Sequence, residues 1–165
     1  MTKHTALQLN TELEDILSEY LFRAYHSKSH LEDRHIGKDL RYLKGRIHHV
    51  RGIDDVMSTF TCSYAEALHL IHEALVTNVS GIKKWYDNNR YKERLTVVYD
   101  FDHPVGFGIV KGANWNETFE MSRINVVLEA SNEPGRLFTI VTAYPIFNMD
   151  ESDVVWDAIE EWQSR

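Results

Sequence analysis

Residues 94–101 read Arg-Leu-Thr-Val-Val-Tyr-Asp-Phe, and in this stretch the spacing of apolar residues changes from that of a helix to that of a strand. Leu95, Val97, Tyr99 and Phe101 stand at every second position, which is the period of a strand with one buried face. Before this stretch, apolar residues recur every three or four positions, as in amphipathic helices. Helices in the first half and strands in the second predict an α+β domain.

Two helices are predicted in the N-terminal third of the chain. Residues 8–25 carry one apolar stripe at helical spacing. A second helix is expected to begin after Ser29, which matches a capping box together with Glu32. Glycines weaken this second helix, so it can break at Gly37 and begin again with Asp39 as its N-cap.

A third helix and four strands are predicted next. The helix spans residues 64–87, because Ser63 and Glu66 form a capping box in front of a long apolar stripe. Short connections between the strands favour an antiparallel meander. The strands are residues 95–101, 105–111, 124–128 and 137–144, and residues 112–120 are expected to be a loop.

Cys62 is the single cysteine among 165 residues. An intrachain disulfide and a cysteine-based zinc site are therefore excluded. The length suits one domain with one core, residues 1–165. No apolar run approaches the roughly 20 residues of a membrane-spanning helix, so we expect no membrane span and no signal peptide.

The net charge of -7 is unevenly distributed. Residues 148–165 hold six acids against one base, and we expect them to form an acidic helical extension capped by Asp150 or Ser152. Residues 34–51 hold six bases against one acid. Local charge steers a ligand more than total charge does, so the basic stretch is a candidate for contact with phosphate. The alternative is a solvated basic helix face.

A histidine lies at helical spacing from fixed cations within this basic stretch. If one helix spans the segment, His35 and Arg46 are eleven residues apart and share a face, with Lys38 and Tyr42 between them. Such a group places a base that titrates near neutral pH beside permanent positive charge, which suits a phosphodiester substrate. An ordinary surface cluster is the alternative.

Thr142 and Tyr144 are polar residues in the otherwise apolar fourth strand. Because they are two residues apart, both hydroxyl groups are expected on one face of the sheet. Buried hydroxyl groups need partners, so this face is a second candidate for a site. A polar strand end without a function is the alternative, as is a plain turn for Ser58-Thr59-Phe60.

No metal or cofactor site is predicted. His69, His72 and Glu73 lie on one predicted helix, but the spacing of the zinc proteases is absent. Gly106-Phe107-Gly108 is too short for a phosphate-binding loop and lies within a strand signal, so we interpret it as a bend.

Four short motifs occur in a fixed order along the chain: His35-Ile36-Gly37-Lys38, Leu43 with Arg46, Ser58-Thr59-Phe60 and Thr142-Ala143-Tyr144-Pro145. In this order and spacing the sequence resembles the bacterial ribonuclease A-like toxin domain. That domain is found at the C-terminus of contact-dependent growth inhibition toxins and related polymorphic toxins. The similarity covers about residues 29–147, which we take as the toxin core. Asp39 departs from the family, which usually has a small hydroxyl residue there.

The resemblance implies N-terminal helices packed on a curved antiparallel sheet, a ribonuclease A-like fold without disulfides. It implies a metal-independent endoribonuclease that works without a cofactor, by attack of the RNA 2′-hydroxyl on the phosphodiester. Carried over residue by residue, it implies a catalytic set of His35, Arg46, Thr142 and Tyr144, and a supporting substrate-binding set of Lys38, Ser58 and Thr59.

The chemistry of these residues agrees with that role. His35 has the right character for the base, and Arg46 can stabilise charge on the phosphoryl oxygens. No second histidine carries over, so Tyr144, a phenol that keeps its proton at neutral pH, is our candidate for the general acid. His48, His49 and His103 remain open as alternatives.

The resemblance also implies an RNA substrate, a cognate immunity protein, and action in the bacterial cytoplasm after delivery as part of a larger secreted toxin. The main alternative is a non-catalytic binding or regulatory module of the same fold, which the acidic balance favours. A toxin like the ADP-ribosyltransferases ranks last, because the sequence lacks their Glu-x-Glu signature. The oligomeric state and the preferred RNA sequence do not follow from the chain.

Overall fold

The computed structural model describes residues 11–12, 14–15, 35–49, 56–89, 93–114, 116–130 and 138–165. Residues 11–12 and 14–15 are helical, and the rest of the predicted helix 8–25 lies outside the described residues, as does the capping box of Ser29 and Glu32. None of the described helices has the length and apolar content that a membrane crossing needs.

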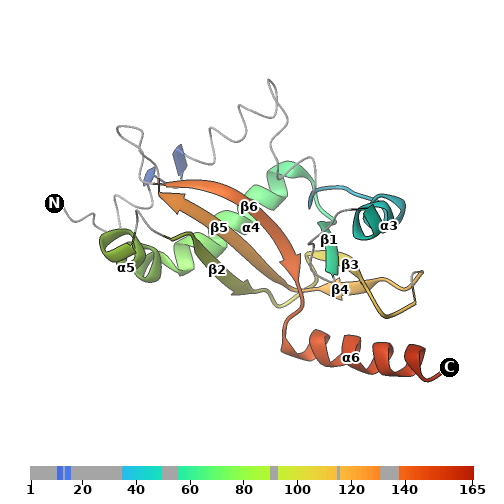
Figure 1. Cartoon of the computed structure of the whole chain (residues 1–165). Coiled ribbons are helices and arrows are strands. Elements are labelled where there is room, and N and C mark those ends of the chain that lie inside the picture. The colour runs from blue at the N-terminus through green and yellow to red at the C-terminus, as the bar shows by residue number, and fades with distance from the viewer. Residues whose placement is uncertain are drawn as a thin grey trace.

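Six strands form two three-stranded antiparallel sheets, so the α+β prediction is confirmed (Figure 1). One sheet has the order β1-β3-β4, with bounds Val56–Phe60, Gly106–Val110 and Phe119–Met121. The other has the order β2-β5-β6, with bounds Leu95–Asp100, Arg123–Ala130 and Phe138–Ile146. The predicted meander is wrong, because β3 does not pair with β2, and the predicted loop 112–120 contains the start of β4.

The two sheets share one bent ribbon. β2 pairs with β5 and β3 pairs with β4, so residues 95–108 run antiparallel to residues 119–128, with a bulge between the two pairings. At the centre, Phe101 N–H donates to the Ser122 carbonyl over 2.7 Å, and Val105 N–H donates to the Met121 carbonyl over 2.8 Å. The five residues from Phe101 to Val105 therefore lie opposite a single residue, Ser122. This arrangement is a large β-bulge, and bulges bend the strands that contain them. This is the curvature that the sequence resemblance implies.

Among the described residues from 35 onward, four helices surround the ribbon, with bounds Leu40–His49 (α3), Tyr64–Thr77 (α4), Val79–Asn89 (α5) and Met149–Gln163 (α6). The break at Gly37, whose φ is +64°, and the Asp39 cap are confirmed: Tyr42 N–H donates to Asp39 Oδ1 over 2.8 Å. The predicted single helix 64–87 is two helices. Asn78 ends α4 by donating from its amide to the Ala74 carbonyl over 2.7 Å.

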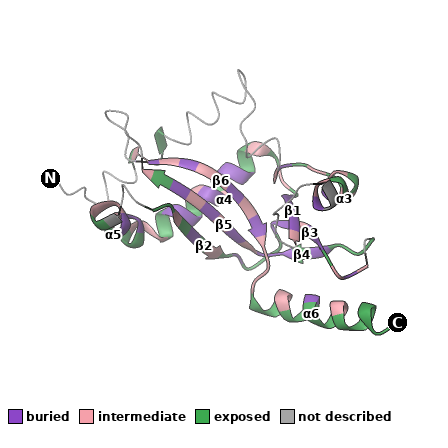
Figure 2. Cartoon of the chain, viewed as in Figure 1, coloured by how far each residue is buried: buried purple, intermediate pink, exposed green. Residues whose placement is uncertain are grey.

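Helix α4 covers one face of the β2-β5-β6 sheet and forms the main core (Figure 2). Ile71 and Leu75 of α4 are fully buried in the same cluster as Val126, Leu128 and Ile140 of the sheet. Burial of each such side chain stabilises the fold by about 1.5–3 kcal/mol. The opposite face of this sheet carries polar residues, Asn125 and Thr142 among them, beside apolar Val98.

A bulge in β6 decides which side chains reach that polar face. Val127 pairs with Thr142 but Leu128 pairs with Ile140, so Val141 is an extra residue in β6. Without the bulge, Ile140 and Thr142 would point the same way, because they are two residues apart. With it, Ile140 and Ala143 both enter the core while Thr142 lies on the other face.

Helices α3 and α6 cover opposite faces of the β1-β3-β4 sheet. Leu43 and Ile47 of α3 pack on Met57 and Ile109, which are buried on one face. Helix α6 packs by Val155 in a second cluster, with Val110, Ala113, Phe119 and partly buried Val56. Because adjacent residues of a strand point to opposite faces, Val56 and Met57 face apart, as do Ile109 and Val110. The acidic helix therefore lies across the sheet from the basic one (Figure 1).

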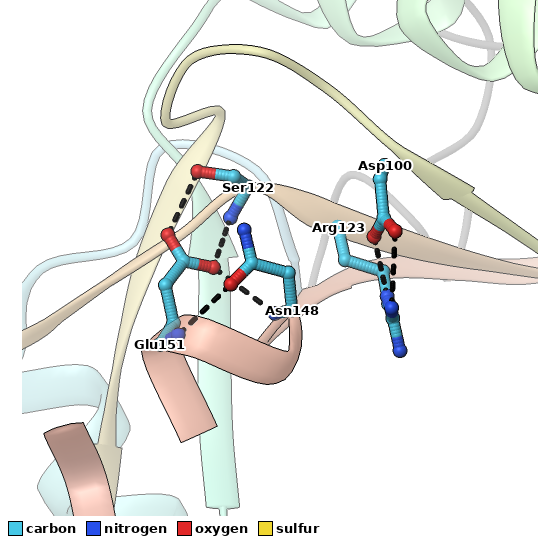
Figure 3. A network of polar contacts seen from close by, with 5 residues as sticks. All are labelled: Asp100, Ser122, Arg123, Asn148 and Glu151. Carbon is cyan, nitrogen blue, oxygen red and sulfur yellow. Dashed lines mark hydrogen bonds and ion pairs between the residues drawn. The ribbon is translucent and has the colours of Figure 1, made fainter. Parts of the chain in front are cut away.

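Glu151 fastens α6 to the bend of the ribbon (Figure 3). Its carboxylate accepts hydrogen bonds from the Ser122 backbone N–H at 2.8 Å, the Ser122 hydroxyl at 2.7 Å and the Asn148 backbone N–H at 3.1 Å. Asn148 in turn caps the helix by accepting from Glu151 N–H over 2.9 Å. The N-cap is thus Asn148, and the predicted caps Asp150 and Ser152 are wrong, because the capping box with Glu151 begins two residues earlier.

We expect Glu151→Ala to destabilise the protein by about 2–3 kcal/mol, because the buried Ser122 amide and hydroxyl lose their partners and the helix loses its capping box. Chemical denaturation followed by circular dichroism measures this. Glu160→Ala removes an equal charge from an exposed position of the same helix and should change stability by less than about 0.5 kcal/mol. Equal losses in the two variants would contradict the anchoring role of Glu151.

Candidate active site

His35 is held against β1 by the residues that follow it. Ile36 forms a parallel bridge with Phe60, and Gly37 N–H donates to the Phe60 carbonyl over 3.2 Å. This pairing brings His35 Nδ1 to 3.4 Å from the Ser58 carbonyl. A carbonyl oxygen only accepts, so the contact requires the proton on Nδ1, and the neutral ring then carries its lone pair on Nε2. That tautomer is the one that a general base at Nε2 needs.

Thr59 and Lys38 form a second link between the same two segments. Lys38 N–H donates to Thr59 Oγ1 over 3.0 Å, and the Thr59 hydroxyl donates to the Phe60 carbonyl at 3.1 Å. Thr59 is almost fully buried, so its hydroxyl holds the Lys38 backbone in place from the protein interior. The Lys38 ammonium lies 5.0 Å from the centre of the Tyr42 ring, in cation–π contact.

Tyr144 joins this segment to the polar face of β6. Its ring and the His35 ring have their centroids 5.4 Å apart, with an angle of 38° between the planes. Thr142, two residues earlier in β6, lies on the same face of the sheet. The structure thus places three of the four predicted catalytic side chains on one side of the second sheet.

Arg46 lies on α3, in an arrangement that differs from the one we expected. One continuous helix from His35 to Arg46 is wrong, because the chain breaks at Gly37 and α3 begins at Leu40. Arg46 instead stands one turn after Leu43, whose side chain packs on β1 and β3. β1 in turn contacts β6, the strand of Thr142 and Tyr144.

Asn125 of β5 belongs to the same face and is absent from our sequence predictions. It pairs in register with Tyr144, and its Nδ2 lies 3.5 Å from the Tyr144 hydroxyl. The sequence does carry a signal for it, because Asn125 is the polar residue between Ile124 and Val126 in an apolar alternation. The cross-strand partner, which depends on the register, could not be read from that alternation.

Three buried side-chain atoms in the described residues have no hydrogen-bond partner: Arg46 Nη1, Asn125 Oδ1 and Thr142 Oγ1. A buried polar atom without a partner costs about 1–3 kcal/mol, so proteins seldom keep one without a reason. Two of the three atoms belong to predicted catalytic residues, and the third belongs to the neighbour of Tyr144. A guanidinium N–H and a hydroxyl are donors suited to phosphate oxygens, which an RNA substrate supplies.

Two further charged pairs lie at and beside the bend of the ribbon. Arg123, two residues from Asn125, binds Asp100 through two hydrogen bonds, and its guanidinium lowers the pKa of the Asp100 carboxyl (Figure 3). His103 lies 2.7 Å from Asp102, whose pKa it lowers by a hydrogen bond. The side chains of His48 and His49, the other candidate acids, lie outside the described residues.

Among the residues that the structure describes, no three His, Cys, Asp or Glu side chains form a group that could hold a metal ion. The one cysteine, Cys62, is half-buried, and burial raises the pKa of its thiol. A raised pKa keeps the thiol protonated and poorly nucleophilic, so Cys62 does not compete with His35 as the reactive group.

Comparison with known proteins gives a consistent result. The family model of the bacterial CdiA-CT RNAse A domain matches residues 29–145. A solved structure, the CdiA-CT/CdiI complex from Y. kristensenii, is similar with a TM-score of 0.62 and 23% sequence identity. The similarity covers 72% of this chain and 99% of that chain, and at this identity it shows a shared fold. No curated protein matches the chain.

We expect Thr142→Val to leave stability unchanged or to raise it by up to about 1 kcal/mol, because the valine replaces a buried hydroxyl that has no partner. Thermal and denaturant unfolding measure the change. Thr61→Val is the matched control, since the Thr61 hydroxyl donates to the Val105 carbonyl over 3.3 Å and its loss should destabilise. A Thr142→Val loss as large as that of the control would show that the Thr142 hydroxyl has a partner within the protein.

Proposed function

The chain belongs to the family of bacterial CdiA-CT RNAse A domains, and from this premise we propose that it is a metal-independent endoribonuclease toxin that cleaves RNA to a 2′,3′-cyclic phosphate. The observation that carries the proposal is the contact of the His35 and Tyr144 rings on a face where Thr142 and Asn125 keep buried polar atoms without partners. A base, an acid and unused hydrogen-bonding groups are what phosphodiester cleavage requires.

The proposed reaction uses the substrate's own nucleophile. The RNA 2′-hydroxyl is adjacent to the scissile phosphate, so positioning alone gives a large rate advantage. His35 Nε2 takes the 2′-hydroxyl proton while the 2′-oxygen bonds to phosphorus. Tyr144 gives its proton to the 5′-oxygen as the P–O5′ bond breaks. Solvent then returns the proton to Tyr144 and accepts the one held by His35.

Charge on the phosphoryl oxygens is stabilised by donors that the fold leaves unsatisfied. Within the part of the chain that the structure describes, Arg46 and Thr142 hold buried donors without hydrogen-bond partners, so a bound phosphate would supply acceptors for them. Lys38 adds a cation on the segment next to His35. Ser58 and Thr59 are almost fully buried, and they act as supports: the Ser58 carbonyl orients His35 and the Thr59 hydroxyl fixes Lys38.

An immunity protein is the partner that we propose for this chain. The similar solved structure is a complex of CdiA-CT with CdiI, and a free ribonuclease would damage the cell that makes it. We also propose delivery into a target cell as the end of a larger secreted toxin. Residues 29–147 then form the toxin core and residues 148–165 form an acidic extension.

We expect the protein to degrade total RNA in the presence of EDTA, and His35→Ala to lower the rate by at least about 100-fold, the usual contribution of a general base. Single-stranded DNA should survive, since it lacks the 2′-hydroxyl. Gel analysis of RNA and of DNA with matched sequences measures both. Loss of activity in EDTA that magnesium restores would refute the metal-independent mechanism, and an inactive wild type would favour the non-catalytic module.

We expect the acidic charge of α6 to have little effect on catalysis, because α6 packs on the face of the β1-β3-β4 sheet opposite α3. Exposed charges more than about 10 Å apart are largely screened at physiological salt. The triple variant Asp153→Asn, Asp157→Asn, Glu160→Gln should cleave RNA within about twofold of the wild-type rate at low and high salt. A much faster variant at low salt alone would show that the extension restrains the enzyme.

A further inference from the structure

Asn125 is a partly buried polar side chain beside Tyr144, and the proposed reaction gives it no role. Its Nδ2 faces the Tyr144 hydroxyl at 3.5 Å, and the two residues are direct cross-strand partners. A nitrogen of an amide group only donates, so the Tyr144 oxygen is the acceptor in this contact. The hydrogen of the phenol is then not used in the contact and can point toward a substrate.

The surroundings of Asn125 fix this arrangement. The neighbouring residues Ile124 and Val126 are fully buried in the core, which holds the backbone of Asn125 in the centre of the sheet. On the β2 side its register partner is Val98, which offers no polar group. The amide nitrogen therefore has Tyr144 as its polar neighbour across the ladder, and the amide oxygen has no hydrogen-bond partner among the residues that the structure describes.

We propose that Asn125 is a positioning residue for the general acid: its amide donates to the Tyr144 oxygen, directs the phenol proton to the 5′-oxygen of the substrate and stabilises the phenolate left after transfer. This inference rests on the proposed function. In the step itself, the O–H bond of Tyr144 breaks, the proton joins the leaving 5′-oxygen, and the amide N–H remains bonded to nitrogen throughout. Hydrogen bonds to a charged group are stronger than those to a neutral one, so the amide favours the state after proton transfer.

The role predicts a dependence on the leaving group. A ribonucleoside 5′-oxygen is a poor leaving group and needs a proton, whereas 4-nitrophenolate leaves without one. A residue that acts through the general acid should matter for the first and not for the second. A residue that only maintains the fold, or that helps His35 or the phosphate site, should matter equally for both.

The experiment compares wild type and Asn125→Leu on uridylyl-3′,5′-adenosine and on uridine 3′-(4-nitrophenyl phosphate). We expect kcat on the dinucleotide to fall about 10- to 100-fold, the size of a lost hydrogen bond to a charged group, with KM unchanged. On the nitrophenyl ester kcat should stay within about twofold of wild type. Val98→Leu is the matched control, because it alters the cross-strand neighbour of Asn125 on the same face and should leave both rates unchanged.

A second comparison tests whether Asn125 acts through Tyr144. Tyr144→Phe and the double variant Asn125→Leu, Tyr144→Phe should be equally slow on the dinucleotide, since the amide then has no phenol to position. Equal losses of Asn125→Leu on both substrates, additive losses in the double variant, or no loss on the dinucleotide would each overturn the role of Asn125. A wild-type protein that cleaves neither substrate would overturn the proposed function, and this inference with it.

Discussion

The bend of the long antiparallel ribbon at Ser122 is the constraint on which the rest of the structure depends. Five residues, from Phe101 to Val105, stand opposite this one serine, so the ribbon cannot continue flat and divides into two sheets. Each half then gains a third strand, β1 on one and β6 on the other, and these two strands contact one another. His35 lies beside β1 and Tyr144 lies in β6, so the bend is what allows residues more than 100 positions apart to meet.

A second irregularity sets the chemistry of the face that the bend creates. The extra residue Val141 reverses the alternation of β6, so the same strand buries Ile140 in the core and presents Thr142 and Tyr144 to the site. On the resulting face, the described residues Thr142 and Asn125 each hold a buried polar atom without a hydrogen-bond partner. Such groups reduce stability, and natural proteins keep them mainly where a ligand completes their hydrogen bonds. The groups that lower the stability of the free protein are therefore the ones that a bound phosphate would provide with hydrogen bonds.

The sequence predicted what depends on neighbours along the chain. Asp39 and Ser63 cap helices as expected, because a cap needs only the three residues that follow it. The sequence did not predict features that depend on residues far away along the chain, such as the register of paired strands. Asn125 was missed because only the register of β5 against β6 shows that it faces Tyr144, and the shared helix of His35 and Arg46 was wrong because Gly37 adopts a positive φ. The family resemblance supplied His35 and Arg46 as site residues where local pattern could not, but it did not supply Asn125.

The net charge of -7 is compatible with an RNA substrate once the placement of the charges is considered. The acids of α6 and the bases of α3 are separated by the β1-β3-β4 sheet. Met57 packs against α3 and Val56 packs against α6, and these adjacent strand residues point to opposite faces. Packing elements on a sheet spaces them about 10 Å from it, which is about one Debye length at physiological salt. A phosphate bound on the α3 side, as we propose, would therefore meet the nearby cations with little influence from the screened acids behind the sheet. The placement of the charged helices follows from the alternation of side chains along the strands. This placement matters more to the site than the net charge of the chain does.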